Sequence, residues 1–153
     1  MQRFFIELAF RGTNYHGWQR QPNAITVQLV LEESLEKLTG QTLATTGAGR
    51  TDAGVHARHF TAHFDSHHLF TGDPETFRYK LNGILPADIA VKRIYAVMPE
   101  AHARFSALSR TYEYLISTVR DPFAVGLSWY YSRPLDLDAM NRAASELPNY
   151  DDF

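Results

Sequence analysis

The chain has 153 residues, of which 44% are hydrophobic and 21% charged, with no cysteine and a formal net charge of −2. This length supports one compact core, at most one domain plus a fragment of another, and the lack of cysteine excludes disulfides and thiolate metal sites. No apolar run is long enough to cross a membrane and no signal peptide is recognisable, so we expect a soluble, cytoplasmic protein.

The cations are distributed unevenly along the chain. Twelve of the fifteen are Arg and three are Lys, and Arg is suited to forked hydrogen bonds with phosphate and to stacking on bases. Residues 50–63 hold two Arg, three His and a single acid. The total charge therefore gives no argument for nucleic-acid binding, but the local pattern is compatible with it.

Alternation of apolar and polar residues predicts a first strand over 3–11, RFFIELAFR, followed by the polar loop GTNYHGWQRQPNA. Apolar residues at helical spacing then predict a helix from Thr26 to Lys37, which Thr26 caps and Gly40 ends. A short strand near 42–46 leads into a glycine-rich loop.

A further strand, helix and strand follow the glycine-rich loop. Residues 58–66 alternate again, which directs three apolar side chains inward and four others outward: Phe60, Ala62 and Phe64 against His59, Thr61, His63 and Asp65. Asp73 and Pro74 mark a helix start, Gly83 its stop, and 89–97 the next strand. The order β-α-β-β-α-β predicts an α+β, ferredoxin-like antiparallel sheet with helices on one face and the other face open for a ligand.

Further elements are expected after this unit. Strands are predicted around 103–106, 111–119 and 129–131, and an amphipathic helix over 136–147 that Pro148 stops.

The loop GAGRTDAGVHA, residues 47–57, places one acid, Asp52, between Arg50 and His56. Gly49 and Gly54 have phosphate-loop spacing, but the Lys and Ser or Thr of that motif are missing, and Asp52 stands where a dinucleotide fingerprint needs Gly. An anionic side chain would also repel a phosphate. A structural alternative is a flexible strand connection in which Arg50 and Asp52 form an exposed ion pair, worth roughly 0 to 1 kcal/mol.

Five stretches occur in one order along the chain: GTNYHGWQRQ, GRTDAGVHA, NGILPADIAV, ARFSALSRTYEY and WYYSRPLDLDAMNRAA. Together they resemble the tRNA pseudouridine synthase A family over essentially the whole chain, and GRTDAGVHA matches that family's catalytic signature. The resemblance implies an isomerase that converts uridine to pseudouridine at positions 38–40 of the tRNA anticodon stem-loop, needs no cofactor and forms a homodimer.

The resemblance also implies a division of the chain. Residues 1–107 are expected to form the N-terminal ferredoxin-like domain with the catalytic loop, and residues 108–153 to begin the second half of the family fold. We expect the sequence to be the N-terminal portion of a longer enzyme, inactive without the remainder.

The resemblance assigns three residues to the chemistry. Asp52 matches the catalytic Asp, Arg50 its partner in base flipping, and Tyr112 the Tyr that stacks on the target base. A carboxylate can attack a sugar carbon or remove a proton there, flexible glycines allow close approach, and a nearby Arg keeps the acid ionised. The structural alternative for Tyr112 is a core aromatic of a strand, which is also our interpretation of Tyr114.

Cations and aromatics near these motifs are candidates for tRNA contact: Arg58, His59, His102, Arg104 and Phe105. Arg20 is a weaker candidate, and each residue has the alternative of a solvated surface position. Trp18 is interpreted as a packing residue.

Five histidines between His56 and His68 raise the possibility of a metal site. His59 and His63 share a face of a strand but lie about 13 Å apart, too far for one zinc ion, so we expect no metal.

Two other functions remain open from the residues themselves. A non-catalytic RNA-binding module would use the same sheet architecture, but it gains nothing from an acid directed at RNA. A sugar hydrolase would need two carboxylates in the loop region, where only Asp52 occurs.

Overall fold

A computed structural model describes residues 1–67 and 73–151 of the chain. The chain forms two compact units, residues 1–111 and 112–153, which we describe separately. His68, considered above for a metal, and the chain end at Asp152 and Phe153 lie outside the described residues.

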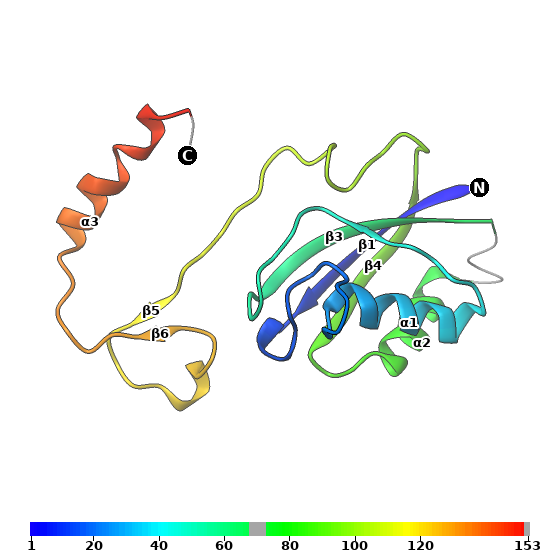
Figure 1. The fold of residues 1–153 in the computed structure, drawn as a ribbon, viewed down its shortest axis with the longest axis horizontal. Helices are drawn as coiled ribbons and strands as arrows, with labels where there is room; N and C mark the ends of the chain where they lie inside the picture. Colours follow the sequence, from blue (N-terminus) through cyan, green and yellow to red (C-terminus); the bar gives the residue numbers. More distant parts are fainter. Residues whose placement is uncertain (68–72, 152–153) are drawn as a thin grey trace. The chain divides into compact units, whose positions relative to one another are not determined.

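The first unit is a four-stranded antiparallel sheet with two helices on one face (Figure 1). The strands are β1 (Gln2–Phe10), β2 (Thr46–Gly47), β3 (Ala57–Ser66) and β4 (Ile89–Val97), and the helices are α1 (Val27–Thr39) and α2 (Pro74–Ile84). The sheet order β2-β3-β1-β4 is that of a ferredoxin-like unit. The predicted α+β fold is confirmed.

The caps of α1 are those that the sequence predicts. The hydroxyl of Thr26 accepts a hydrogen bond from the Leu29 N–H at 3.3 Å, which satisfies one of the free donors of the first turn. Gly40 ends the helix in the left-handed conformation with φ of 69°, although α1 reaches Thr39, beyond the predicted Lys37.

Helix α2 begins as predicted but ends later. Asp73 caps it by accepting from the Thr76 N–H at 3.2 Å. The helix continues through Gly83 to Ile84 and stops before Leu85, which adopts an extended conformation. Pro86 explains this end better than Gly83, because proline disfavours the helical conformation of the residue before it.

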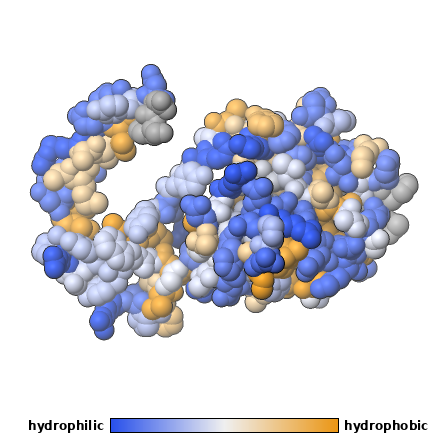
Figure 2. All heavy atoms as spheres, in the orientation of Figure 1, coloured by the Kyte–Doolittle hydropathy of each residue, from blue (hydrophilic) through white to orange (hydrophobic). Residues whose placement is uncertain are grey.

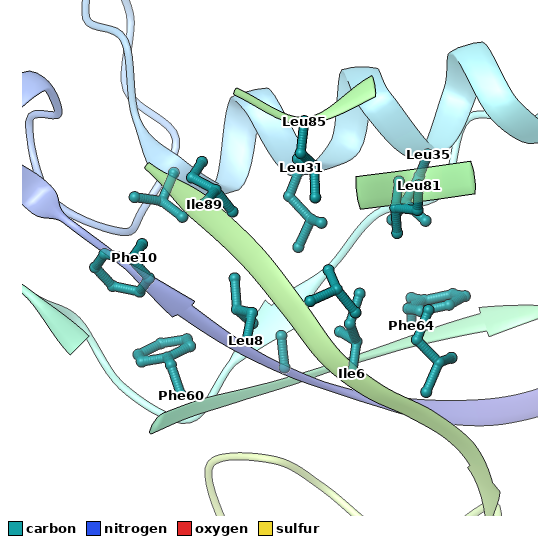
Figure 3. Packing of buried hydrophobic residues seen from close by; sticks show 14 of the residues in the cluster. Ile6, Leu8, Phe10, Leu31, Leu35, Phe60, Phe64, Leu81, Leu85 and Ile89 are labelled. Atoms are coloured by element: carbon teal, nitrogen blue, oxygen red, sulfur yellow. The ribbon is translucent and has the colours of Figure 1, made fainter. Parts of the chain in front are cut away.

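The core lies between the sheet and the two helices, where apolar side chains from both layers point toward one another (Figure 3). Apolar residues of the strands and helices are buried there, among them Phe60 and Phe64, which were predicted to face inward, and burying each side chain contributes roughly 1.5 to 3 kcal/mol. They include Ile6, Leu8, Phe10, Val27, Leu31, Leu35, Phe60, Phe64 and Leu81.

The predicted strand over 42–46 is reduced to β2, two residues long. The preceding segment is held by a helix instead of by a neighbouring strand. Thr45 donates from both its N–H and its hydroxyl to Glu32 on α1, at 2.8 and 3.0 Å.

The second unit has little regular structure. It contains the short parallel pair β5 (Ile116–Ser117) and β6 (Trp129–Tyr130) and the helix α3 (Leu137–Ala144). The predicted strands over 111–119 and 129–131 are therefore much shorter than expected, and the helix predicted to reach 147 ends at Ala144. A strand needs a partner along its whole length, and within the described residues this unit offers only two paired positions.

Apolar atoms lie at the surface of the second unit (Figure 2). None of the residues in its described helices and strands is buried. Tyr114, interpreted from the sequence as a core residue, is 79% exposed, so that interpretation is wrong for this structure. Among the described residues, no helix combines the length and apolar character needed to span a bilayer.

Candidate active-site loop

The loop that carries Asp52 connects β2 to β3. It begins with a hydrogen bond from the Ala48 N–H to the Thr61 carbonyl at 2.8 Å. It then turns at Ala53 and Gly54, where Gly54 has φ of 82° and Val55 donates to the Asp52 carbonyl at 3.2 Å. The loop therefore presents Asp52 next to a tight turn.

Arg50 and Asp52 are both exposed, and among the described residues their side chains form no ion pair or hydrogen bond. The exposed ion pair considered from the sequence is therefore absent among the described residues, and residues 50–52 belong to no helix or strand. The Asp52 carboxylate is thus unengaged in this part of the structure.

A second loop, between β1 and α1, holds the backbone of the Asp52 loop. The Gly54 N–H donates to the Tyr15 carbonyl at 3.1 Å, and the Gly12 N–H donates to Nδ1 of His56 at 3.0 Å. The backbone N–H of Trp18 adds a longer hydrogen bond to the Thr51 carbonyl at 3.4 Å. These bonds hold the loop on both sides of Asp52.

Two glycines make this close approach possible. A Cβ built on Gly12 would overlap the carbonyl oxygen of Val55, and one on Gly17 would overlap that of Thr51. Gly17 also has φ of 79°, a conformation that side chains disfavour. These two glycines of the GTNYHGWQRQ motif place the Asp52 loop, a role that the motif did not indicate without the structure.

The second loop is itself anchored by Asp88. The Tyr15 hydroxyl donates to Oδ1 of Asp88 at 2.5 Å, Asn14 donates to Oδ2 at 3.0 Å, and the Arg11 N–H donates to the Asp88 carbonyl at 2.8 Å. Burial and the Asp88 carboxylate raise the pKa of the Tyr15 phenol above its ordinary value. Tyr15 therefore stays a hydrogen-bond donor at neutral pH.

Trp18 is a packing residue, as predicted. It is 2% exposed, and its ring centroid lies 4.4 Å from that of Phe60. Gly47 leaves room for the indole, since a Cβ there would collide with the ring. Arg20 lies 3.4 Å from Glu32 in an exposed ion pair.

Residues 101–106 form a compact turn, and the strand predicted over 103–106 is absent. The reason is local: Nδ1 of His102 accepts the N–H groups of Arg104 and Phe105 at 3.1 and 3.3 Å. The His102 and Phe105 rings lie 4.4 Å apart, and the Arg104 guanidinium stands 5.6 Å from the Phe105 ring. The turn thus presents an exposed cation and an exposed aromatic side by side.

His63 faces the same turn. It was expected to point outward, but it is 6% exposed, and its Nδ1 accepts the Ala103 N–H at 3.1 Å. The turn therefore covers part of the sheet face that was predicted to be open.

Arg58 and His59 lie near the start of β3, at an irregularity in the sheet. The register of β1 with β3 shifts between the pairs Leu8↔Phe60 and Phe10↔Ala57, which leaves Arg58 and His59 in the bulge. Bulges redirect side chains and are frequent beside active sites. Both residues are exposed, and the Arg58 carbonyl accepts from Nζ of Lys92 at 2.6 Å.

Tyr112 belongs to the second unit and is 74% exposed, whereas the other candidate residues belong to the first. Among the described residues, no group of three or more His, Asp or Glu side chains is placed to hold a metal ion.

Comparisons with known proteins agree on one family. A family model described as tRNA pseudouridine synthase matches residues 8–106. Proteins named tRNA pseudouridine synthase A match the whole chain at 48% identity in Porphyromonas gingivalis, 50% in Parabacteroides distasonis and 47% in Bacteroides fragilis. The chain spans 61%, 60% and 60% of the lengths of these three relatives.

Proposed function

Because the chain belongs to the tRNA pseudouridine synthase family, we propose that it supplies the catalytic-loop domain of an enzyme that isomerises uridine to pseudouridine in tRNA. One observation supports this most directly. Asp52 is exposed and unpaired among the described residues, yet the backbone on both sides of it is held by hydrogen bonds. An acid held in this way is suited to approach a nucleotide.

The proposed chemistry breaks the N-glycosidic bond of the target uridine, turns the base and rejoins it to the sugar through carbon. The Asp52 carboxylate attacks the sugar carbon or removes a proton from it, and it stabilises positive charge as the bond opens. The target base first leaves its stack, at a cost of a few kcal/mol.

The remaining roles are part of the same proposal. Arg50 fills the gap that the flipped nucleotide leaves, and Tyr112 stacks on the base. The cation and aromatic of the 101–106 turn, together with the bulge residues Arg58 and His59, contact the tRNA backbone and unpaired bases. The proposed targets are positions 38–40 of the anticodon stem-loop.

The enzyme that we propose is as long as its relatives, acts in the cytoplasm as a homodimer and needs no cofactor. The relatives support the length, because the chain spans only about 60% of them.

The test is tritium release from tRNA that carries 5-tritiated uridine, because forming a carbon link at that position displaces the label. We expect Asp52→Asn in the full-length protein to lower turnover by more than about 10³-fold while tRNA binding stays within a few-fold. Glu33→Gln, an exposed acid on α1, is the matched control and keeps full turnover.

Lost tRNA binding of comparable size in Asp52→Asn would make Asp52 structural. No release from the full-length protein, with tRNA binding intact, would instead favour a non-catalytic RNA-binding module.

A further inference from the structure

The side chain of Arg110 also supports the Asp52 loop, at the beginning of the loop. Nε and Nη2 of Arg110 both donate to the Ala48 carbonyl, at 3.1 and 2.8 Å. Nη2 also donates to the Arg104 carbonyl at 2.8 Å. One guanidinium therefore joins the loop to the 101–106 turn.

This support adds to one already described at the same residue, where the Ala48 N–H donates to the Thr61 carbonyl at 2.8 Å. The β1–α1 loop contacts the Asp52 loop at Thr51 and beyond, whereas Ala48 lies four residues before Asp52. Among the described residues, Arg110 is the one side chain that hydrogen-bonds to the loop between β2 and Asp52.

Gly49 brings the guanidinium directly against the loop backbone. A Cβ at Gly49 would lie 3.4 Å from Nε of Arg110, at the limit of a close contact. The flat guanidinium thus packs along Gly49 while it bonds to Ala48. Loss of Arg110 would keep the bond from the Ala48 N–H to Thr61 but remove the side-chain support of the Ala48 carbonyl, next to a glycine that restricts the backbone least.

Arginine is suited to this position because its planar fork offers several donors in a fixed geometry. A lysine ammonium carries the same charge, but it cannot hold two carbonyls and pack flat against a glycine at once. Arg110 is exposed, so its substitution should change the position of the loop more than the packing of the core.

We propose that Arg110 is a positioning residue for Asp52: its guanidinium fixes the start of the loop and thereby the distance of the carboxylate from the target sugar. This inference rests on the function proposed above. Misplacing a reacting group by about 1 Å can cost roughly 10²-fold in rate.

The first test is kinetic and uses the full-length protein. We expect Arg110→Ala and Arg110→Lys to lower kcat for pseudouridine formation by about 10- to 100-fold, with KM for tRNA changed by less than about threefold. Added methylguanidinium should restore part of the kcat of Arg110→Ala, and methylammonium should not. The control is Arg78→Ala, whose side chain bonds within α2 to Glu75; it keeps full kcat.

The second test does not depend on activity. In Arg110→Ala, amide hydrogen exchange of Ala48, Gly54 and Val55, the hydrogen-bonded amides of the loop, should become about tenfold faster, while the β3 amides of Ala62 and Phe64 keep their rates.

Each outcome decides one question. Unchanged kcat with unchanged exchange overturns the role of Arg110, and so does a raised KM with normal kcat, which would make Arg110 a tRNA contact. If the unsubstituted full-length protein forms no pseudouridine, the proposed function fails, and the exchange rates alone decide whether Arg110 holds the loop.

Discussion

At the scale of single residues, His63 shows how distant contacts change the environment that a strand pattern suggests. The ring is buried under the 101–106 turn, 4.6 Å from the ring of His102. Burial lowers the pKa of His63, and the nearby charges of Arg3 and His102 lower it further, while Asp65 opposes them. His63 is therefore neutral in the folded protein at neutral pH, and its Nδ1 accepts the Ala103 N–H.

This pKa difference predicts a pH-dependent stability. The unfolded chain protonates His63 near its ordinary pKa of about 6.5, while the folded chain protonates it only at lower pH. The unfolded state then binds more protons, so the free energy of unfolding falls as pH falls from about 7.5 through the folded pKa. Urea denaturation between about pH 7.5 and 5.5 should show a smaller fall for His63→Gln.

His59→Gln, at an exposed position of the same strand, is the comparison variant measured beside it. Equal pH dependence in His63→Gln and the unsubstituted chain would contradict the assignment.

The sequence predicts residues whose environment is set by their neighbours along the chain. Phe60, Ala62 and Phe64 are buried as alternation predicts. His63 was predicted to point outward, which is wrong, and Arg110 was given no role. Their hydrogen-bond partners lie 40 and 62 residues away, and no local pattern encodes such contacts.

At the scale of elements, the contact between the β1–α1 loop and the Asp52 loop depends on backbones packing without side chains. Gly17 and Gly40 form a natural comparison. Both have positive φ, 79° and 69°, but a Cβ on Gly17 would overlap the Thr51 carbonyl, while Gly40 has no heavy atom within 4 Å of that position.

We therefore expect Gly40→Ala to lower the free energy of unfolding by about 1 to 2 kcal/mol, the cost of the left-handed conformation alone. Gly17→Ala should lower it by clearly more and should also reduce turnover in the full-length protein, because Thr51 adjoins Asp52. Chemical denaturation measures the first effect and tritium release the second. Equal destabilisation by both substitutions would mean that the loops separate at little cost.

Elements with local signals were predicted well. The caps Thr26, Asp73 and Gly40 lie where expected, because a cap is defined within a few residues. The strands over 42–46 and 111–119 were overestimated, since a strand forms only where a partner strand pairs with it.

At the scale of the whole molecule, the chain is short relative to its family. It spans about 60% of its relatives, and its second unit exposes apolar side chains, among them Tyr112, Leu137 and Met140 at 74%, 62% and 45%. Contiguous exposed apolar patches mark surfaces suited to contact with another protein segment or a ligand.

We predict that this chain alone binds tRNA weakly and releases no tritium from labelled tRNA. A chimera that joins it to the remaining part of the Porphyromonas gingivalis relative should release tritium. Robust turnover by the chain alone would contradict the prediction, and a folded but inactive chimera would show that the two parts are not interchangeable.

The distance along the sequence between Ala48 and Arg110 also determines when their hydrogen bonds can form during translation. Arg110 is translated 62 residues after Ala48, which takes roughly 3 to 12 seconds at about 5 to 20 residues per second. Until then the Ala48 carbonyl of a nascent chain lacks its Arg110 partner, although the Thr61 carbonyl that accepts the Ala48 N–H is already made. If Arg110 has the positioning role proposed above, the start of the Asp52 loop gains its full set of hydrogen bonds only after the ribosome has completed β4 and the turn that follows it.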